Sequence, residues 1–284
     1  MRKIVIPTDF SVNAFNAFKY AVDLFKYEKS EFFVVHAYAD EVYDQEVILS
    51  RELMEELKAK TLERTNKELQ LLLDKIKEYS PNPRHSFKAI STFGSLVDGV
   101  NHLINKENAD VAIMGTRGKT NDRSISFGSN TLQVLKYVQC PVLSIPEDFE
   151  YKRPEKMLFP SNFLIPYQKR ELKLVAELAK SYRSEIHMIY ISNFPADSYR
   201  QKDNQIILKE QFHESDFYFH CVDEGDKLEI IKKFIKDLEI DLLIMVNSRH
   251  TYLESILYQS TIDKIGLHPK IPFLVLQNYN RECT

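Results

Sequence analysis

An internal repeat constrains the fold of this chain more than any other feature of its sequence. Residues 3–10 read KIVIPTDF and residues 156–163 read KMLFPSNF, so the two segments match at a constant offset of 153. Farther along, residues 235–276 match residues 104–145 without a gap at an offset of 131. The smaller offset means that the second copy is shorter, chiefly around residues 193–217. A chain of 284 residues is therefore expected to hold two copies of one fold.

The repeat also predicts where the domains begin and end. We expect one domain over residues 1–147 and a second over residues 154–278, joined by a short linker. A long leucine-containing stretch at residues 46–79 is most simply a covering helix, but it is also a candidate contact for an unknown protein partner or for a second chain in a homodimer.

Short apolar runs alternate with amphipathic stretches in each copy. The runs of the first copy, which we interpret as strands, are residues 3–6, 32–37, 87–90, 110–114 and 142–145. Between them, apolar residues recur at helical spacing. This alternation predicts an α/β fold with a parallel sheet and helices on both of its faces. Right-handed crossovers favour the strand order 3-2-1-4-5 in each copy.

A glycine-containing stretch, residues 114–131 (MGTRGKTNDRSISFGSNT), follows the fourth predicted strand and precedes a helix. It holds Gly115, Gly118 and Gly128, three of the seven glycines of the chain. Glycines here are expected to adopt positive φ and to let the backbone approach a ligand. A helix N-terminus offers N–H groups to an anion, so the stretch is suited to phosphate. The alternative is a glycine-tolerant turn with a Ser N-cap.

Asp9 is expected to face this loop. In open α/β sheets, ligands bind beyond the carboxyl ends of the strands, where the strand order reverses. The order 3-2-1-4-5 puts strands 1 and 4 side by side, so Asp9 and the glycine loop would share one crevice. A carboxylate opposite a phosphate site suits a nucleotide. The alternative role of Asp9 is an Asx-turn or a helix cap before Asn13.

The spacing of these glycines resembles a known signature. Gly115-x2-Gly118-x9-Gly128-Ser129 is similar to the ATP-binding motif G-x2-G-x9-G-(S/T) of the universal stress protein family, and Pro7-Thr8-Asp9 is similar to the end of its first strand. The resemblance covers both copies, so the chain looks like a tandem universal stress protein. It implies copies paired through their fifth strands, and ATP or AMP, with or without Mg²⁺, bound in the crevice.

The resemblance also assigns roles to individual residues. It implies that Asp9 holds the base or ribose side and that Ala37 lines the adenine pocket. The remaining residues would approach the ribose and phosphates or shape the pocket through their backbone; they are Pro7, Thr8, Gly115, Gly118, Gly128, Ser129 and Asn130. No residue is assigned a catalytic or metal-binding role.

The second copy departs from the motif at each of these places. Asn162, Val246, Arg249 and Gln259 replace Asp9, Gly115, Gly118 and Gly128, and only Ser260 keeps its type. A β-branched Val where the backbone needs positive φ is a steric objection to the same loop. We therefore expect nucleotide in the first copy only.

Other motifs are absent or incomplete. Gly118-Lys119-Thr120 resembles the end of a Walker A loop, but the required first glycine is replaced by Ile113. Arg117 and Lys119 are candidates to flank a phosphate, with a solvated loop charge as the simpler interpretation. His36 is interpreted as a packing or edge residue.

Composition narrows the function classes. A net charge of −3 gives no reason to expect a nucleic acid or an anionic membrane as partner. No apolar run approaches a membrane span, and the three cysteines have no metal-ligand or disulfide spacing, so we expect a cytoplasmic protein.

Three functions remain in view. The first is a stress-response signalling module whose adenine nucleotide sets its conformation or partner choice. The second is a slow ATPase or nucleotidyl-transfer enzyme, which would need a metal ligand, a base or a cationic clamp. Since only Asp9, Arg117 and Lys119 are candidates for those roles, binding with at most weak hydrolysis is favoured. The third is a nucleotide-free scaffold.

Overall fold

The computed structural model describes residues 1–44, 50–118, 127–248, 253 and 270–278. In the first half the elements are β1 (Arg2–Pro7), α1 (Val12–Leu24), β2 (Ser30–Ala37), α2 (Ala39–Tyr43), α3 (Arg51–Tyr79), β3 (His85–Thr92), α4 (Leu96–Glu107), β4 (Val111–Gly115), α5 (Ser129–Tyr137) and β5 (Val142–Ile145). In the second half they are β6 (Lys156–Pro160), α6 (Lys169–Tyr182), β7 (Glu185–Ile191), α7 (Tyr199–Gln211), β8 (Asp216–Val222), α8 (Lys227–Asp237), β9 (Leu242–Asn247) and β10 (Phe273–Gln277).

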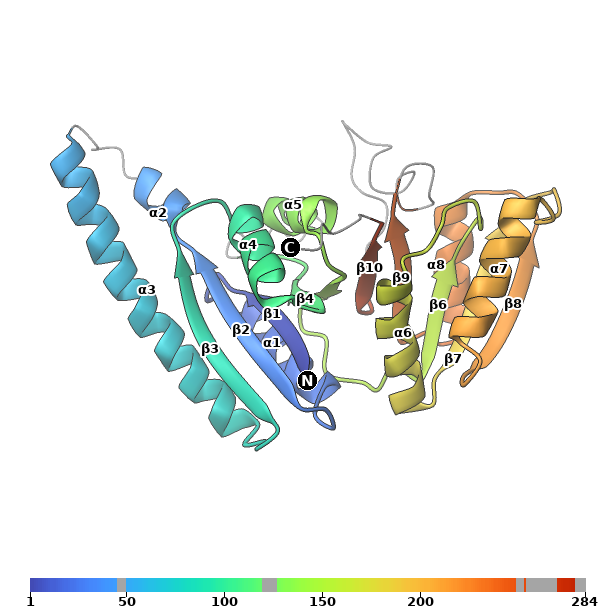
Figure 1. Ribbon diagram of the computed structural model, residues 1–284, viewed down its shortest axis with the longest axis horizontal. Helices are drawn as coiled ribbons and strands as arrows, with labels where there is room; N and C mark the ends of the chain where they lie inside the picture. The colour runs from blue at the N-terminus through green and yellow to red at the C-terminus, as the bar shows by residue number, and fades with distance from the viewer. Residues whose placement is uncertain (45–49, 119–126, 249–252, 254–269, 279–284) are drawn as a thin grey trace.

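The described strands form one sheet across both halves (Figure 1). Its ten strands follow the order β3-β2-β1-β4-β5-β10-β9-β6-β7-β8, which is 3-2-1-4-5 in the first half and the reverse of the same order in the second. Strands pair in parallel within each half, whereas β5 and β10 pair antiparallel, with Leu143 opposite Leu274. The predicted fold class is confirmed. The domain bounds 1–147 and 154–278 stay predictions.

The pairing registers of the two halves coincide with the sequence repeat. Ile4 lies opposite Val111 and Met157 lies opposite Leu242, which are equivalent pairs at the offsets found in the sequence. In each half a carboxylate just before the fourth strand bonds the start of the first strand. Asp110 accepts from the backbone N–H of Lys3 at 2.8 Å, and Asp241 accepts in the same way from Lys156 at 3.0 Å. The two halves therefore share more than their strand order.

Side chains alternate along each strand and build a core on both faces of the sheet. Ile4 and Ile6 join a core covered by α1, α3, α6 and α7, whereas Val5 joins the core under α4, α5 and α8. Because both faces are covered, the central strands are apolar on both sides. A binding site is therefore expected at the strand ends and in the loops, which the helices do not cover.

Serine caps fix where several helices begin. Ser11 accepts from the backbone N–H of Ala14 at the start of α1, and Ser95 accepts from Asp98 at the start of α4. The helix expected at residues 46–79 is α3, which begins at Arg51 after its cap Ser50. The short α2 precedes it, and residues 45–49 lie outside the described residues.

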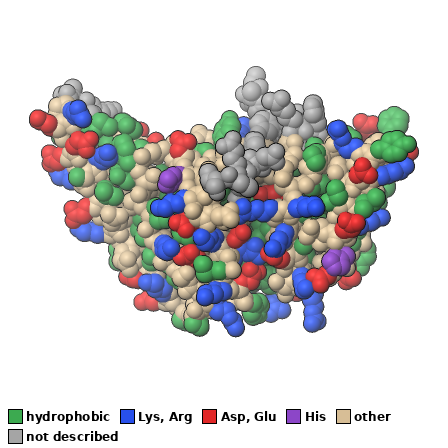
Figure 2. Space-filling model, in the orientation of Figure 1, with side chains coloured by type: hydrophobic (Ala, Val, Ile, Leu, Met, Phe, Trp, Pro, Cys, Tyr) green, Lys and Arg blue, Asp and Glu red, His purple; other side chains and the backbone are tan. Residues whose placement is uncertain are grey.

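Charged side chains of both signs are interspersed on the face shown in Figure 2. Ion pairs also join the two halves: Arg2 pairs with Glu177 at 2.6 Å, and Arg170 pairs with Asp110 at 3.6 Å. None of the helices in the described part of the chain has both the length and the apolar character needed to cross a membrane.

Candidate functional site

The loop after β1 is a compact pair of turns. Thr8 Oγ1 accepts from the N–H of Phe10 at 3.0 Å, and Asp9 Oδ1 accepts from the N–H of Ser11 at 3.0 Å. Phe10 adopts a φ of 63°, which an L-residue rarely does. Asp9 thus forms the Asx-turn that was its alternative role, but this turn uses only one of the two carboxylate oxygens.

The second oxygen of Asp9 faces the glycine loop. A Cβ built on Gly118 would lie 2.7 Å from Asp9 Oδ2, a distance that real Cβ contacts do not show. Any larger residue at position 118 would therefore displace the carboxylate. The predicted meeting of Asp9 with the loop after β4 is present in the structure.

Gly115 is favoured by tight packing at the end of β4. A Cβ on Gly115 would lie 3.2 Å from the carbonyl oxygen of Asn13, at the start of α1. Helix α1 can approach the strand this closely because position 115 has no side chain. Gly115 and Gly118 are thus explained by close approach to neighbouring protein groups.

The expectation that these glycines adopt positive φ is wrong. Every glycine among the described residues has a φ outside that region. Close approach, and not a left-handed backbone, explains the first two glycines of the motif. The steric objection to Val246 is therefore also wrong, because Val246 lies within β9 and has an ordinary strand conformation.

Gly128 has no such explanation. It is the N-cap of α5, with φ −62° and ψ 158°, values open to any residue. A Cβ on Gly128 would lie 3.7 Å from Arg117 Cα and 3.8 Å from the nitrogen of Gly118, which are ordinary contacts. Neither the backbone nor the packing of the described residues requires glycine at position 128. The alternative of a Ser N-cap is also wrong, because Ser129 is the first residue of the helix.

The start of α5 is fixed to β4 by two bonds. The N–H of Gly128 donates to Thr116 O at 2.9 Å, and Thr131 Oγ1 donates to Gly115 O at 3.0 Å. Ser129 and Asn130 occupy the first turn of the helix, where N–H groups have no partner within the helix. This arrangement places the positive end of the helix dipole beside the loop.

The end of β2 lies beside the end of β1 at the same edge of the sheet. Ala37 is the last residue of β2 and is half-buried, and burial raises the pKa of the neighbouring Tyr38. Pro7, the last residue of β1, lies opposite Val35 of β2. Both residues therefore lie at the carboxyl ends of neighbouring strands, and their roles in a nucleotide pocket stay predictions.

His36 does more than pack. Its Nδ1 lies 2.7 Å from Thr8 O and its Nε2 lies 2.9 Å from Glu41 Oε1. Glu41 also pairs with Arg64 of α3. His36 therefore ties the loop after β1 to α2 and α3. No sequence motif marked this chain of contacts, since its members are brought together only by the fold.

Arg117 is not a solvated loop charge. Its guanidinium pairs with Glu147, just beyond β5, at 2.9 Å, and the two side chains are 16% and 17% exposed. The pair neutralises the one cation of this loop within the described residues. Lys119, the other candidate, lies outside the described residues.

The second half repeats the turns after its first strand. Ser161 Oγ accepts from the N–H of Phe163 at 2.9 Å, and Asn162 Oδ1 accepts from Leu164 at 3.1 Å. Phe163 adopts a φ of 57°, as Phe10 does in the first half. Because Asn162 builds the turn that Asp9 builds, the turn does not need a negative charge.

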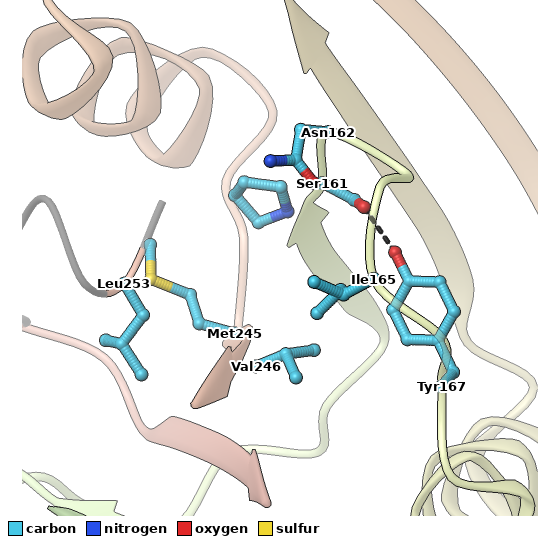
Figure 3. Close-up of a pocket in the computed structure, with 8 residues that line it drawn as sticks. Ser161, Asn162, Ile165, Tyr167, Met245, Val246 and Leu253 are labelled. Carbon is cyan, nitrogen blue, oxygen red and sulfur yellow. Dashed lines mark hydrogen bonds between the residues drawn. The ribbon is translucent and has the colours of Figure 1, made fainter. Parts of the chain in front are cut away.

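The crevice of the second half is filled by its own side chains (Figure 3). Ile165 and Tyr167 approach from the loop before α6, Val246 from β9, and Leu253 from the far side. About 10 Å³ remains, room for about one water molecule. Tyr167 is held by a hydrogen bond to Ser161. Arg249, Gln259 and Ser260 lie outside the described residues.

A proline explains how this filling arises. Helix α6 begins at Lys169, whereas α1 begins at Val12, which is equivalent to Ile165. Pro166 disfavours a helical conformation for Ile165, so the first turn of the equivalent helix is lost. The freed residues fold into the crevice.

Comparisons with known proteins agree with this architecture. The family described as the Universal stress protein family matches residues 1–146. Two universal stress proteins of Methanocaldococcus jannaschii are similar: MJ0531 is 29% identical over 155 residues, covering 55% of this chain and 84% of that protein. MJ0577 is 27% identical over 157 residues, covering 51% of this chain and 94% of that protein.

A solved structure extends the likeness of fold to both halves. A universal stress protein from Archaeoglobus fulgidus superposes with a TM-score of 0.66 at 19% identity, over 97% of this chain and 98% of that chain. At this identity the likeness concerns the fold alone. Since the family match spans half of the chain, with the strand order and the crevice described above, the chain belongs to the universal stress protein family.

Proposed function

We propose that the first half binds an adenine nucleotide, ATP or AMP, in the crevice between the ends of β1 and β4, as a binding and signalling module. One observation carries the proposal: Gly128 caps α5 in a conformation and a packing environment that do not require glycine. A missing side chain at a helix N-terminus leaves room for an anionic group there, and phosphate is the group that such a position favours.

The neighbouring residues support the same assignment. Asp9 lies against Gly118, so the loop that would hold phosphates also borders a carboxylate able to accept from a hydroxyl or an amine. In this proposal Asp9 and Ala37 contact the nucleoside, and Pro7 and Thr8 shape its pocket. Gly115, Gly118, Gly128, Ser129 and Asn130 face the ribose and phosphates.

We further propose that only the first half binds nucleotide and that residues 154–278 form a second, degenerate domain. The small pocket at the equivalent strand ends supports this, because the described side chains of Ile165, Tyr167 and Val246 leave only about 10 Å³ there. The neutral Asn162 supports it as well, since the negative charge is lost while the turn is kept.

Binding without efficient turnover is the form of the function that the site supports. Arg117 is engaged by Glu147, so it is not aimed at a developing charge on a phosphate. Phosphate release in the presence of Mg²⁺ tests this. A turnover of about 1 s⁻¹ or faster, within the range of ordinary enzymes, would contradict it.

Titration calorimetry with ATP tests the binding proposal. The unaltered protein should bind one nucleotide per chain, and Gly128→Gln should weaken binding at least about tenfold by filling the phosphate position. The matched control is Gly94→Gln, because a Cβ on Gly94 meets nothing within 4 Å. Undiminished affinity of Gly128→Gln would contradict the proposal, and two nucleotides per chain would contradict the restriction to the first half. Mass spectrometry of ligand released from fresh protein would distinguish ATP from AMP.

A further inference from the structure

Side chains from the second half of the chain bond the last turn of α5. Asn247 Nδ2 lies 3.2 Å from Leu135 O and 3.1 Å from Lys136 O. Gln277 Nε2 donates to the same Leu135 carbonyl at 3.0 Å. Carbonyl oxygens only accept, so both amides present their N–H groups to the helix. They satisfy carbonyls that have no partner at the end of a helix.

These two amides are themselves held in place. Asn247 and Gln277 are register neighbours at the ends of β9 and β10. One of the two N–H groups of Asn247 Nδ2 donates to Gln277 Oε1 at 2.8 Å, and the other is shared between the carbonyls of Leu135 and Lys136. Gln277 is 1% exposed, and its backbone N–H donates to Glu171 Oε2 at 3.1 Å. The donors therefore belong to the rigid sheet of the second half.

The equivalent residues of the first half carry no amide. Asn247 aligns with Thr116 and Gln277 aligns with Pro146. Within the first half, Asn101 Nδ2 bonds the carbonyl of Tyr137 at 3.1 Å. The carbonyls of Leu135 and Lys136 accept from side chains of the second half. The second copy lacks the glycine motif and carries at the same strand end a contact to the first copy.

We propose that Asn247 and Gln277 are positioning residues for the nucleotide site of the first half. Helix α5 has nine residues, so it spans about 14 Å and moves as one rigid body. Its start carries Gly128 and Ser129 and is bonded to β4. Its end is bonded both by Asn101 of the first half and by Asn247 and Gln277 of the second half. The second half therefore contributes to where α5 presents its N-terminal N–H groups to the phosphates. This inference rests on the proposed function.

A pair of variants tests the contact. Asn247→Asp keeps the size of the side chain but puts oxygens against the carbonyls of Leu135 and Lys136, at the negative end of the helix dipole. Asn247→Thr takes the residue of the first half at this position and carries the test if Asn247→Asp does not fold. The matched control is Asn278→Asp, since Asn278 bonds Gln168 and Ser248 within the second half.

Two measurements on the full chain separate positioning from general destabilisation. Hydrogen exchange without nucleotide should become faster at the amides of α5 in both variants. The affinity for ATP should fall about tenfold in Asn247→Asp and about threefold in Asn247→Thr, as expected for one lost hydrogen bond. The affinity for adenosine should stay within about twofold, because α5 faces only the phosphates. Asn278→Asp should change none of these values.

Each result has a definite meaning. Unchanged exchange at α5, or unchanged ATP affinity despite faster exchange, would overturn the positioning role alone. Equal losses for ATP and adenosine would also overturn it, because a structural defect does not distinguish the two ligands. If the unaltered protein binds neither ligand, the proposed function fails, and the positioning role fails with it.

Discussion

The crevices of the two halves start from the same turn and end differently. In both, a hydroxyl and an Asx side chain bond the next backbone N–H groups, and a Phe takes positive φ. In the first half Asp9 then lies against Gly118, and in the second half Ile165, Tyr167 and Val246 fill the equivalent space. The turn therefore belongs to the fold that both halves share, whereas the acid and the glycines are present in the first half alone and are the residues that we propose for its nucleotide site.

The largest effect is expected at the contact between Asp9 and Gly118. Gly118→Val would place a branched side chain where Asp9 Oδ2 now lies, so the affinity for ATP should fall about 100-fold. Calorimetry measures the loss. Gly94→Val is the control, because its Cβ lies in open space. Equal affinity of the two variants for ATP would show that the contact between Asp9 and Gly118 does not contribute to nucleotide binding.

Removing a side chain that fills the second crevice should cost stability. Ile165→Ala should lower the free energy of unfolding by about 2 kcal/mol, the low end for truncating a buried Ile. Urea denaturation measures it. The control is Val12→Ala at the equivalent position, where Val12 is 80% exposed, and its cost should stay within about 0.5 kcal/mol. A second bound ATP in Ile165→Ala would show that filling alone blocks the second site.

Exchanging Asp9 and its equivalent Asn162 tests whether the negative charge of Asp9 contributes to ATP binding independently of the turn. Asp9→Asn should weaken ATP binding about tenfold, since a charged acceptor is lost, and leave the melting temperature unchanged. The melting temperature should hold because Asn162 makes the same turn in the second half. Asn162→Asp is the reciprocal control and should not alter ATP binding. A large fall in the melting temperature of Asp9→Asn would instead assign the acid to folding.

The smallest effect concerns a difference between the outer strands. His220 of β8 lies opposite Ile189, where Ile90 lies opposite Val35 in the first half. Burial, then the neighbouring His187, lowers the pKa of His220 below its ordinary value of 6.5. The folded state therefore disfavours protonation of His220. Its contribution to the free energy of unfolding is fully present above pH 6.5, the pKa in the unfolded chain, and is lost as the pH falls through the lower pKa of the folded state.

His220→Ile should therefore reduce the loss of melting temperature between pH 7.5 and about pH 5.5. The exposed His213→Gln is the control and should leave that loss unchanged. An identical loss in His220→Ile and in the unaltered protein would assign the acid sensitivity to other groups.

Much of the fold followed from pattern and repetition. The alternation of apolar runs predicted the strands, and right-handed crossovers predicted their order, because these rules act on local sequence and chain connectivity. The repeat also predicted the equivalent pairs Asp110 and Asp241, which hold the same backbone bond in each half. The glycine motif predicts a nucleotide site at the ends of β1 and β4, and the roles of its residues stay predictions.

The sequence by itself determined that the chain holds two copies of one fold and that only the first copy keeps the glycines and the acid. Only the tertiary structure showed what surrounds each glycine of the motif. A side chain at position 118 would meet Asp9, and one at position 115 would meet the start of α1. A Cβ at position 128 would make only ordinary contacts with the described protein groups. The tertiary structure also decided that Asn247 reaches Leu135, more than a hundred residues away in the sequence. Such contacts depend on how rigid elements are placed against one another, which local periodicity does not encode.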